Sequence, residues 1–150
     1  MLMQATKRLG RLNAQFSTQY VYGDRIEQLA KMRRDYNEVP LNEDECRDGP
    51  FPLFQKWLDE AVQNKVTEPN AMCLSTVTKD SRPAARFVLL KGFSPETGFC
   101  WYTNYDSRKG QELLVNPYAA LTFWWGDMER SVRVEGKVSK VPAEESDMYF

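Results

Sequence analysis

Residues 84–110 of the 150-residue chain read AARFVLLKGFSPETGFCWYTNYDSRKG, and this stretch sets the expected fold. Apolar residues predict strands over 83–91 and 99–104, and the Gly-, Pro- and Ser-containing segment 92–98 predicts the turn between them. Asp106 and Ser107 then suit a helix N-cap, because short polar side chains accept hydrogen bonds from the free N–H groups of a first turn. The stretch is therefore expected to fold as strand, turn, strand and helix start.

The first turn of that helix carries two cations, Arg108 and Lys109. Cations there oppose the helix macrodipole, which favours negative charge at a helix N-terminus. A bound anion such as phosphate would resolve the conflict, because the free N–H groups and both side chains would hold it together. Two solvated surface cations are the alternative, since a first-turn cation costs only about 0.3–1 kcal/mol. Both interpretations stay open at this point.

The strand pattern continues on both sides of this stretch. Residues 71–78 predict a strand before it, and residues 118–125 form an almost unbroken apolar run that predicts a strand buried on both faces. Residues 130–141 alternate, with Val132 and Val134 among those expected to face inward. Five strands with short turns and one inserted helix, which ends at 116–117, predict a mainly β fold. This is an antiparallel barrel or strongly curled sheet.

A second, amphipathic helix is expected over residues 51–64, where Phe54 and Trp57 recur at helical spacing as core residues. Preceding prolines suit its first turn. A shorter helix is expected around Ile26 and Leu29. The acidic segment 43–48 between these two helices is expected to be exposed.

The composition excludes several classes of function. A net charge of −1 argues against a general polyanion binder, and no apolar run approaches the roughly 20 residues of a membrane span. The three cysteines form no CxxC motif, which fits a reducing compartment. The sequence has no histidine, so a Ser-His-Asp triad, a Cys-His pair and a His-ligated metal are excluded within it. Redox chemistry would therefore need a bound cofactor.

The first 31 residues differ from the rest. Lys7, Arg8 and Arg11 precede the first acidic residue, Asp24, and this composition is typical of a mitochondrial transit segment. A frayed basic N-terminus is the alternative. We expect residues 1–31 to form a weakly ordered N-terminal segment, with targeting as one role, and residues 32–150 to form one domain.

Seven segments, in this order and spacing, resemble the pyridoxine/pyridoxamine 5'-phosphate oxidase family. They are MRRDY (32–36), FQKWLDEA (54–61), EPNAMCLSTV (68–77), RFVLLKGF (86–93), YTNYDSRKG (102–110), NPYAAL (116–121) and ERSVRVEGKV (129–138). The resemblance implies an FMN-binding split β-barrel of antiparallel Greek-key type with peripheral helices, working as a homodimer with the flavin at the subunit interface. It implies oxidation of pyridoxine or pyridoxamine 5'-phosphate to pyridoxal 5'-phosphate, with O2 as acceptor and H2O2 as product.

The resemblance also implies site residues. Those expected to contact FMN are Arg86, Phe87, Val88, Leu89, Lys91, Tyr102, Thr103, Arg108, Lys109 and Ser131. Those expected to contact the substrate are Lys91, Tyr149 and the covering segment Arg33, Arg34, Asp35 and Tyr36. No side chain is expected to be catalytic and no metal is implied, because the flavin carries the reactivity. The implied setting is cytoplasmic, without nucleic-acid or membrane partners.

Two features complicate this assignment. In a regular strand Arg86 and Lys91 point to opposite faces, so a shared site requires a bulge or strand end near Lys91 and Gly92. The family usually has Gln at the position of Ser131, and the shorter serine side chain weakens the case for that contact.

The C-terminus leads to an expectation about activity. Pro142 and Glu144 suit a helix start, but only about two turns remain before Phe150, fewer than an isolated helix needs. The family continues beyond this position with a closing strand and further ligands, so we expect an incomplete domain with little oxidase activity. One alternative is a non-catalytic fragment that binds FMN or pyridoxal phosphate weakly. Another, a barrel that binds single-stranded nucleic acid through aromatic and basic side chains, is disfavoured by the net charge and the seven segments.

Overall fold

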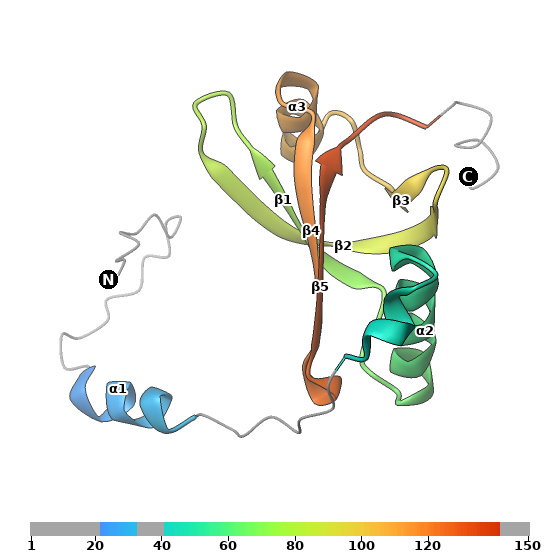
Figure 1. Cartoon of the computed structure of the whole chain (residues 1–150). Helices are drawn as coiled ribbons and strands as arrows, with labels where there is room; N and C mark the ends of the chain where they lie inside the picture. Colours follow the sequence, from blue (N-terminus) through green and yellow to red (C-terminus); the bar gives the residue numbers. More distant parts are fainter. Residues whose placement is uncertain (1–21, 33–40, 142–150) are drawn as a thin grey trace. The chain divides into compact units, whose positions relative to one another are not determined.

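The computed structural model describes residues 22–32 and 41–141 (Figure 1). Helix α1 (Tyr22–Lys31) belongs to a separate unit from the rest of the chain. Its last turn carries an ion pair between Lys31 and Glu27, with Nζ 2.6 Å from the carboxylate oxygen. The helix expected around Ile26 is thus confirmed, whereas the predicted targeting role concerns residues outside the described ranges and stays a prediction.

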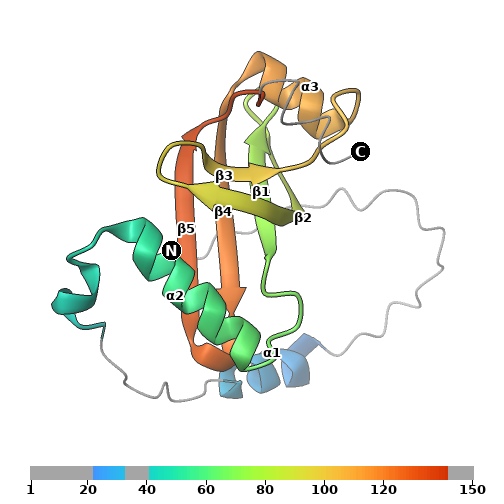
Figure 2. The same cartoon turned by 90° about the vertical axis from the view of Figure 1, so that its right-hand side faces the viewer.

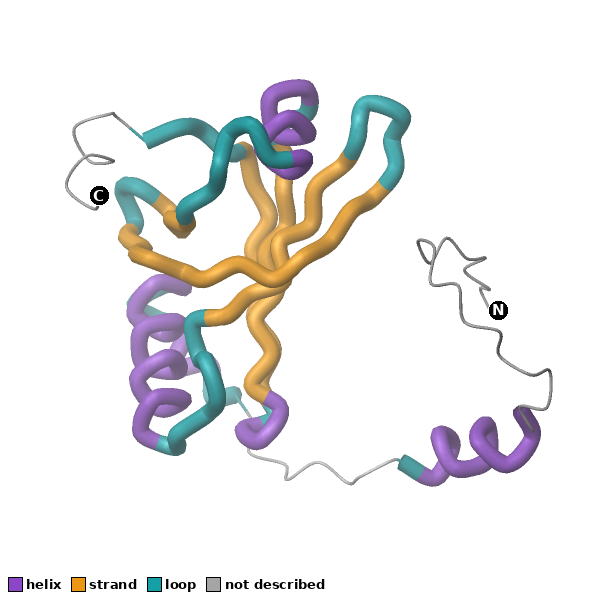
Figure 3. Tube along the Cα trace, turned by 180° about the vertical axis from the view of Figure 1, so that it is seen from behind, coloured by secondary structure: helices purple, strands orange, loops and turns teal. Residues whose placement is uncertain are grey.

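Residues 41–141 build a five-stranded antiparallel sheet with the strand order β3-β2-β1-β4-β5. The strands are β1 (Ala71–Val77), β2 (Pro83–Ser94), β3 (Gly98–Trp101), β4 (Tyr118–Trp125) and β5 (Arg130–Lys137). The sheet is strongly curled, because β2 bends and carries β3 across the direction of the other strands (Figures 2 and 3). The predicted mainly β, antiparallel and curled architecture is confirmed. The described part forms a half-barrel.

Several predicted strand ends were wrong by a few residues. β2 continues past Lys91 to Ser94 because residues 92–94 pair with β3, which leaves only a short turn at 95–97. The Ser94 hydroxyl accepts a hydrogen bond from the Thr97 amide at 3.0 Å and stabilises that turn. β3 ends at Trp101 and β5 at Lys137, both earlier than predicted.

The prediction that β4 is buried on both faces was also wrong. Phe123 and Trp125 lie in the core at 0% and 1% exposure, whereas Trp124 is 63% exposed on the opposite face. The apolar run therefore serves two surfaces. Its inward residues pack beneath α2, while its outward residues remain a large apolar surface of this chain.

Helix α2 (Pro50–Gln63) covers one end of the inner face, as Figure 2 shows. The ring of Phe54 meets those of Phe93, Phe99 and Phe123 edge-on, with centroids 4.8, 4.9 and 5.0 Å away. Such pairs add to the stabilisation from apolar burial. The predicted core role of Phe54 is thus confirmed.

Short connections complete the unit. The exposed acidic segment before α2 is a 3-10 helix, η1 (Glu43–Cys46), and a second one, η2 (Gly126–Met128), joins β4 to β5. Helix α3 (Arg108–Val115) lies at the opposite end of the sheet from α2 (Figure 1). No helix among the described residues has the length and apolar character needed to cross a membrane.

Candidate functional site

A β-bulge in β2 lies at Lys91. Leu90 pairs with Trp101 and Gly92 pairs with Cys100, so Lys91 is the extra residue between two neighbouring pairs. A bulge of this kind re-aims the side chains that follow it. A shared site for Arg86 and Lys91 would require a bulge or a strand end here, and the structure has a bulge. The Lys91 Nζ lies 6.0 Å from the ring centroid of Tyr102.

The start of α3 is built by a compact set of polar contacts. Ser107 is the N-cap, as predicted, and its hydroxyl oxygen accepts a hydrogen bond from the Gly110 amide at 3.3 Å. The same hydroxyl donates to the Asn104 carbonyl at 2.6 Å. The Lys109 ammonium lies 3.4 Å from the Ser107 oxygen. The first turn therefore holds a lysine next to the free N–H groups of the helix.

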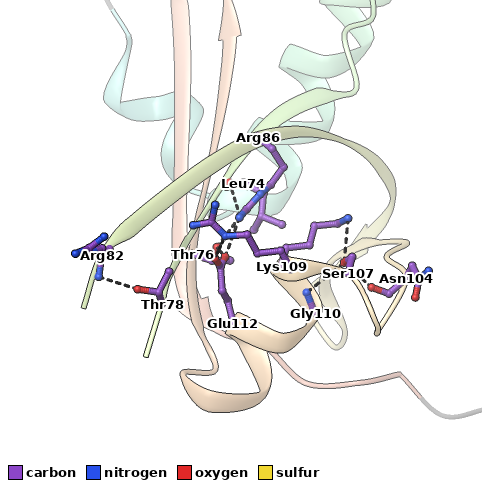
Figure 4. A network of polar contacts seen from close by, with 11 residues as sticks. Leu74, Thr76, Thr78, Arg82, Arg86, Asn104, Ser107, Lys109, Gly110 and Glu112 are labelled. Carbon is purple, nitrogen blue, oxygen red and sulfur yellow. Dashed lines mark hydrogen bonds and ion pairs between the residues drawn. The ribbon is translucent and has the colours of Figure 1, made fainter. Parts of the chain in front are cut away.

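Glu112 provides a buried carboxylate one turn further along α3 (Figure 4). Its Oε2 accepts hydrogen bonds from Thr76 Oγ1 at 2.5 Å and from Arg86 Nη2 at 2.8 Å. Its Oε1 accepts one from Arg108 Nε at 2.7 Å. Burial by itself raises the pKa of Glu112, but the hydrogen bonds from these three groups outweigh it and hold the pKa below the ordinary 4.5. The carboxylate is therefore ionised at neutral pH.

Arg86 crosses from β2 to reach this carboxylate. Its Nη1 donates to Thr76 Oγ1 at 2.6 Å and to the Leu74 carbonyl at 3.2 Å, so β1 and α3 both hold the guanidinium. The Arg86 side chain is 23% exposed, compared with 73% for Arg108. The N-terminal half of α3 and the middle of the sheet are thus joined by one polar network, which sequence reasoning did not predict. The Arg108–Glu112 spacing of four residues was the signal available for it.

A cleft of about 1340 Å³ reaches the start of α3 at Lys109 and Gly110, whereas Arg86, Arg108 and Glu112 are not among its lining residues. Its walls come from the start of α2, from β3 and residues 102–106, from α3, and from β4, β5 and residues 138–141. Trp101 Nε1 and Thr103 Oγ1 line it and are buried without a hydrogen-bond partner in the described ranges. Buried polar groups normally have partners, and leaving one unpaired costs roughly 1–3 kcal/mol. A largely apolar cleft with a few polar groups of this kind is typical of a ligand site.

The outer face of the sheet is the second notable surface. Phe87 is 77% exposed there, and strand pairing through Cys73 places it on the same face as Thr122 and hence Trp124. Leu89 is also exposed on this face. Contiguous exposed apolar surface of this kind commonly marks an interaction site.

The structure distributes the predicted site residues over several places. Tyr102, Thr103 and Lys109 line the cleft, and Arg86 and Arg108 meet at Glu112. Val88 packs against the core, whereas Phe87, Leu89 and Ser131 lie on the outer face. Arg33, Arg34, Asp35, Tyr36 and Tyr149 lie outside the described residues. The ligand roles of all these residues stay predictions.

Comparison with known proteins identifies the lineage. The family model described as pyridoxamine 5'-phosphate oxidase matches residues 58–150, which is more than half of the chain. The chain belongs to the pyridoxamine 5'-phosphate oxidase family. Curated relatives named pyridoxine/pyridoxamine 5'-phosphate oxidase include one from Acaryochloris marina, 53% identical over 122 residues, and one from Nostoc punctiforme, 54% identical over 122 residues. These matches cover 81% of this chain and 55% and 56% of the relatives, so the chain spans about half their length.

Two solved structures share the fold. PhzG from Burkholderia lata, solved with tetrahydrophenazine-1-carboxylic acid, superposes with a TM-score of 0.68 and is 26% identical; the match covers 74% of this chain and 55% of PhzG. A pyridoxamine 5'-phosphate oxidase-related, FMN-binding protein from Nostoc punctiforme gives a TM-score of 0.51 at 19% identity, over 62% of this chain and 52% of that one. The curled antiparallel sheet is thus the half-barrel of pyridoxamine 5'-phosphate oxidase-like split barrels.

Proposed function

We propose that this chain binds FMN and belongs to an oxidase that converts pyridoxine or pyridoxamine 5'-phosphate to pyridoxal 5'-phosphate. The observation that carries the proposal is the set of cations at the start of α3, where Arg86 and Arg108 meet at Glu112. Lys109 in the same turn contacts the Ser107 cap and lines the cleft. Helix N-termini with added cations are well suited to phosphate. The names of the relatives at 53% and 54% identity support the same substrate class.

The described residues fit FMN in two respects. The unpaired Thr103 hydroxyl in the cleft offers a hydrogen bond to a bound polar group. The Lys109 ammonium and the first-turn N–H groups of α3 offer charge-assisted bonds to a terminal phosphate. We infer that Arg108 and Lys109 hold the flavin phosphate and that Tyr102 and Thr103 contact the flavin.

The chain's own contribution is binding and orientation. FMN, when bound, supplies the hydride-accepting chemistry that no side chain here provides, with O2 as the final acceptor and H2O2 as product. We infer that Lys91, which lies at the bulge and near Tyr102, binds the substrate phosphate. Holding the substrate carbon against the flavin lowers the activation free energy, because the entropy lost in orienting the two reactants is lost on binding and not in the reaction itself.

The outer face supports the proposed homodimer. Phe87, Leu89 and Ser131, which are expected flavin contacts, lie on this face together with the exposed Trp124. A second copy covering the face would bury the apolar side chains and bring these residues into a site shared by two subunits. Sedimentation analysis of the purified protein tests this, and a monomer at micromolar concentration would contradict it.

FMN titration and peroxide detection test the function. Apo-protein is titrated with FMN, and binding is followed by quenching of flavin fluorescence. Peroxide is then measured with pyridoxine 5'-phosphate and with pyridoxamine 5'-phosphate. Binding together with turnover supports the full proposal. Binding without peroxide favours the alternative of a non-catalytic FMN-binding protein, and absence of binding refutes both.

A further inference from the structure

We propose that Glu112 is a positioning residue for phosphate binding, because its buried carboxylate orients the guanidinium groups of Arg86 and Arg108 toward the anion. The inference rests on the proposed binding of FMN and goes beyond it, because it assigns a role to a residue of negative charge.

The two oxygens of Glu112 are divided between the two arginines. Oε1 accepts from Arg108 Nε at 2.7 Å, and Oε2 accepts from Arg86 Nη2 at 2.8 Å. Thr76 also donates to Oε2, and the carboxylate is only 6% exposed, so its orientation is fixed from three directions. A fixed acceptor restricts the position of each guanidinium that donates to it, and a hydrogen bond between two charged groups is stronger than one between neutral groups.

This arrangement leaves donors of Arg108 available. Its contact to Glu112 uses Nε, and its two Nη groups have no partner within residues 22–32 and 41–141. The side chain is largely exposed at the helix N-terminus. Two parallel N–H groups of one guanidinium are the geometry that suits a phosphate. Glu112 thus holds Arg108 by one edge while the other edge faces solvent.

Glu112 also reduces the charge repulsion between Arg86 and Arg108. Without a carboxylate between them, the two guanidinium groups would repel each other when no anion is bound. The carboxylate lies between them and offsets that repulsion. Lys109 differs, because its ammonium contacts Ser107 rather than Glu112 within the described residues. The network therefore provides a preformed clamp in the apo-protein rather than one assembled by the ligand.

Simple electrostatics and positioning predict opposite effects of removing this charge. A carboxylate next to a phosphate site repels the ligand, so its neutralisation should tighten binding if charge alone matters. Neutralisation should weaken binding if the carboxylate orients the arginines. The effect should be confined to the phosphate, because the hydrogen bonds of the Glu112 carboxylate go to Thr76 and to the two arginines expected at the phosphate.

The test compares FMN with riboflavin, which has the same ring system and no phosphate, in wild type and in Glu112→Gln. We expect the wild type to prefer FMN and Glu112→Gln to lose about tenfold or more of that preference, with riboflavin affinity unchanged. Glu43→Gln is the matched control, since Glu43 lies in the exposed segment before α2, and it should leave both affinities unchanged.

Each other outcome overturns the inference. Tighter FMN binding by Glu112→Gln would show that charge alone matters, and equal losses for both ligands would show a general structural role. A wild type without preference for FMN would refute the proposed function itself, which separates that failure from a failure of Glu112. If Glu112→Gln does not fold, Thr76→Val serves instead: it keeps the carboxylate, removes one hydroxyl, and should lower the FMN preference in the same direction.

Discussion

Replacing Gly110 by alanine should destabilise the protein, although Gly110 lies in a helix, where alanine is normally the more stable residue. A Cβ at this position would lie 2.3 Å from the Tyr105 carbonyl oxygen, 2.8 Å from the Tyr105 carbonyl carbon and 2.9 Å from the Asn104 oxygen. All three atoms are backbone, so no side-chain rotation relieves the contact. The segment before α3 would have to move away from the helix, and the hydrogen bond from the Gly110 amide to Ser107 would weaken with it.

The expected size follows from three contributions. Alanine gains about 1 kcal/mol over glycine in a helix interior. Overpacking in a closely packed site costs about 1–3 kcal/mol, and a weakened N-cap costs about 1 kcal/mol more. The free energy of unfolding of Gly110→Ala should therefore fall by roughly 1–3 kcal/mol. FMN affinity should fall as well, because the displaced segment contains Thr103 and adjoins Lys109.

Urea unfolding of the apo-protein, followed by circular dichroism, measures the first effect, and FMN titration measures the second. Gly136→Ala is the matched control, because a Cβ there meets nothing within 4 Å, and it should cause no loss of stability. If Gly110→Ala is as stable as wild type or more stable, helix propensity outweighs the close approach and the reasoning is refuted.

Three further predictions concern the charged groups. Arg108→Ala or Lys109→Ala should weaken FMN binding by about 1–3 kcal/mol, measured by fluorescence titration, and unchanged affinity in both would rule out the phosphate clamp. Lys91→Ala should raise KM for the phosphorylated substrate more than it weakens FMN binding, and an unaltered KM would remove Lys91 from the substrate site. Because the pKa of Glu112 is lowered in the folded state, its stabilisation is present above pH 4.5 and lost as pH falls through the folded value. Acid unfolding of Glu112→Gln should thus depend less steeply on pH below 4.5 than that of wild type, and equal slopes would contradict the assignment.

Sequence patterns predicted those elements of the fold whose formation depends on neighbouring residues in the chain. The cap at Ser107 depends on side chains within three residues, and the bounds of β4 coincide with an almost unbroken apolar run. A bulge at Lys91 was one of two irregularities considered, because a regular two-residue period cannot bring Arg86 and Lys91 to one face, and the structure has it. Each of these inferences needed only the sequence near the residue concerned.

Patterns that depend on distant contacts were missed or misread. Glu112 bonds to Thr76 and Arg86, which are 36 and 26 residues away, and nothing local marks such a meeting point. The prediction that β4 is buried on both faces was wrong, because the exposed Trp124 is as apolar as its buried neighbours. An apolar residue in a sequence does not say whether its own chain covers it.

The neighbouring Trp124 and Trp125 point to opposite faces of β4 and therefore experience different solvents. Trp125 is fully buried and donates from Nε1 to the Pro69 carbonyl at 2.9 Å, whereas Trp124 faces water. An indole in water emits at longer wavelength than one in an apolar core. Burial of the outer sheet face by any partner would shift the emission of Trp124 to shorter wavelength and leave Trp125 unaffected, while loss of the core would expose both. A single strand thus carries two optical reporters, one for association and one for folding.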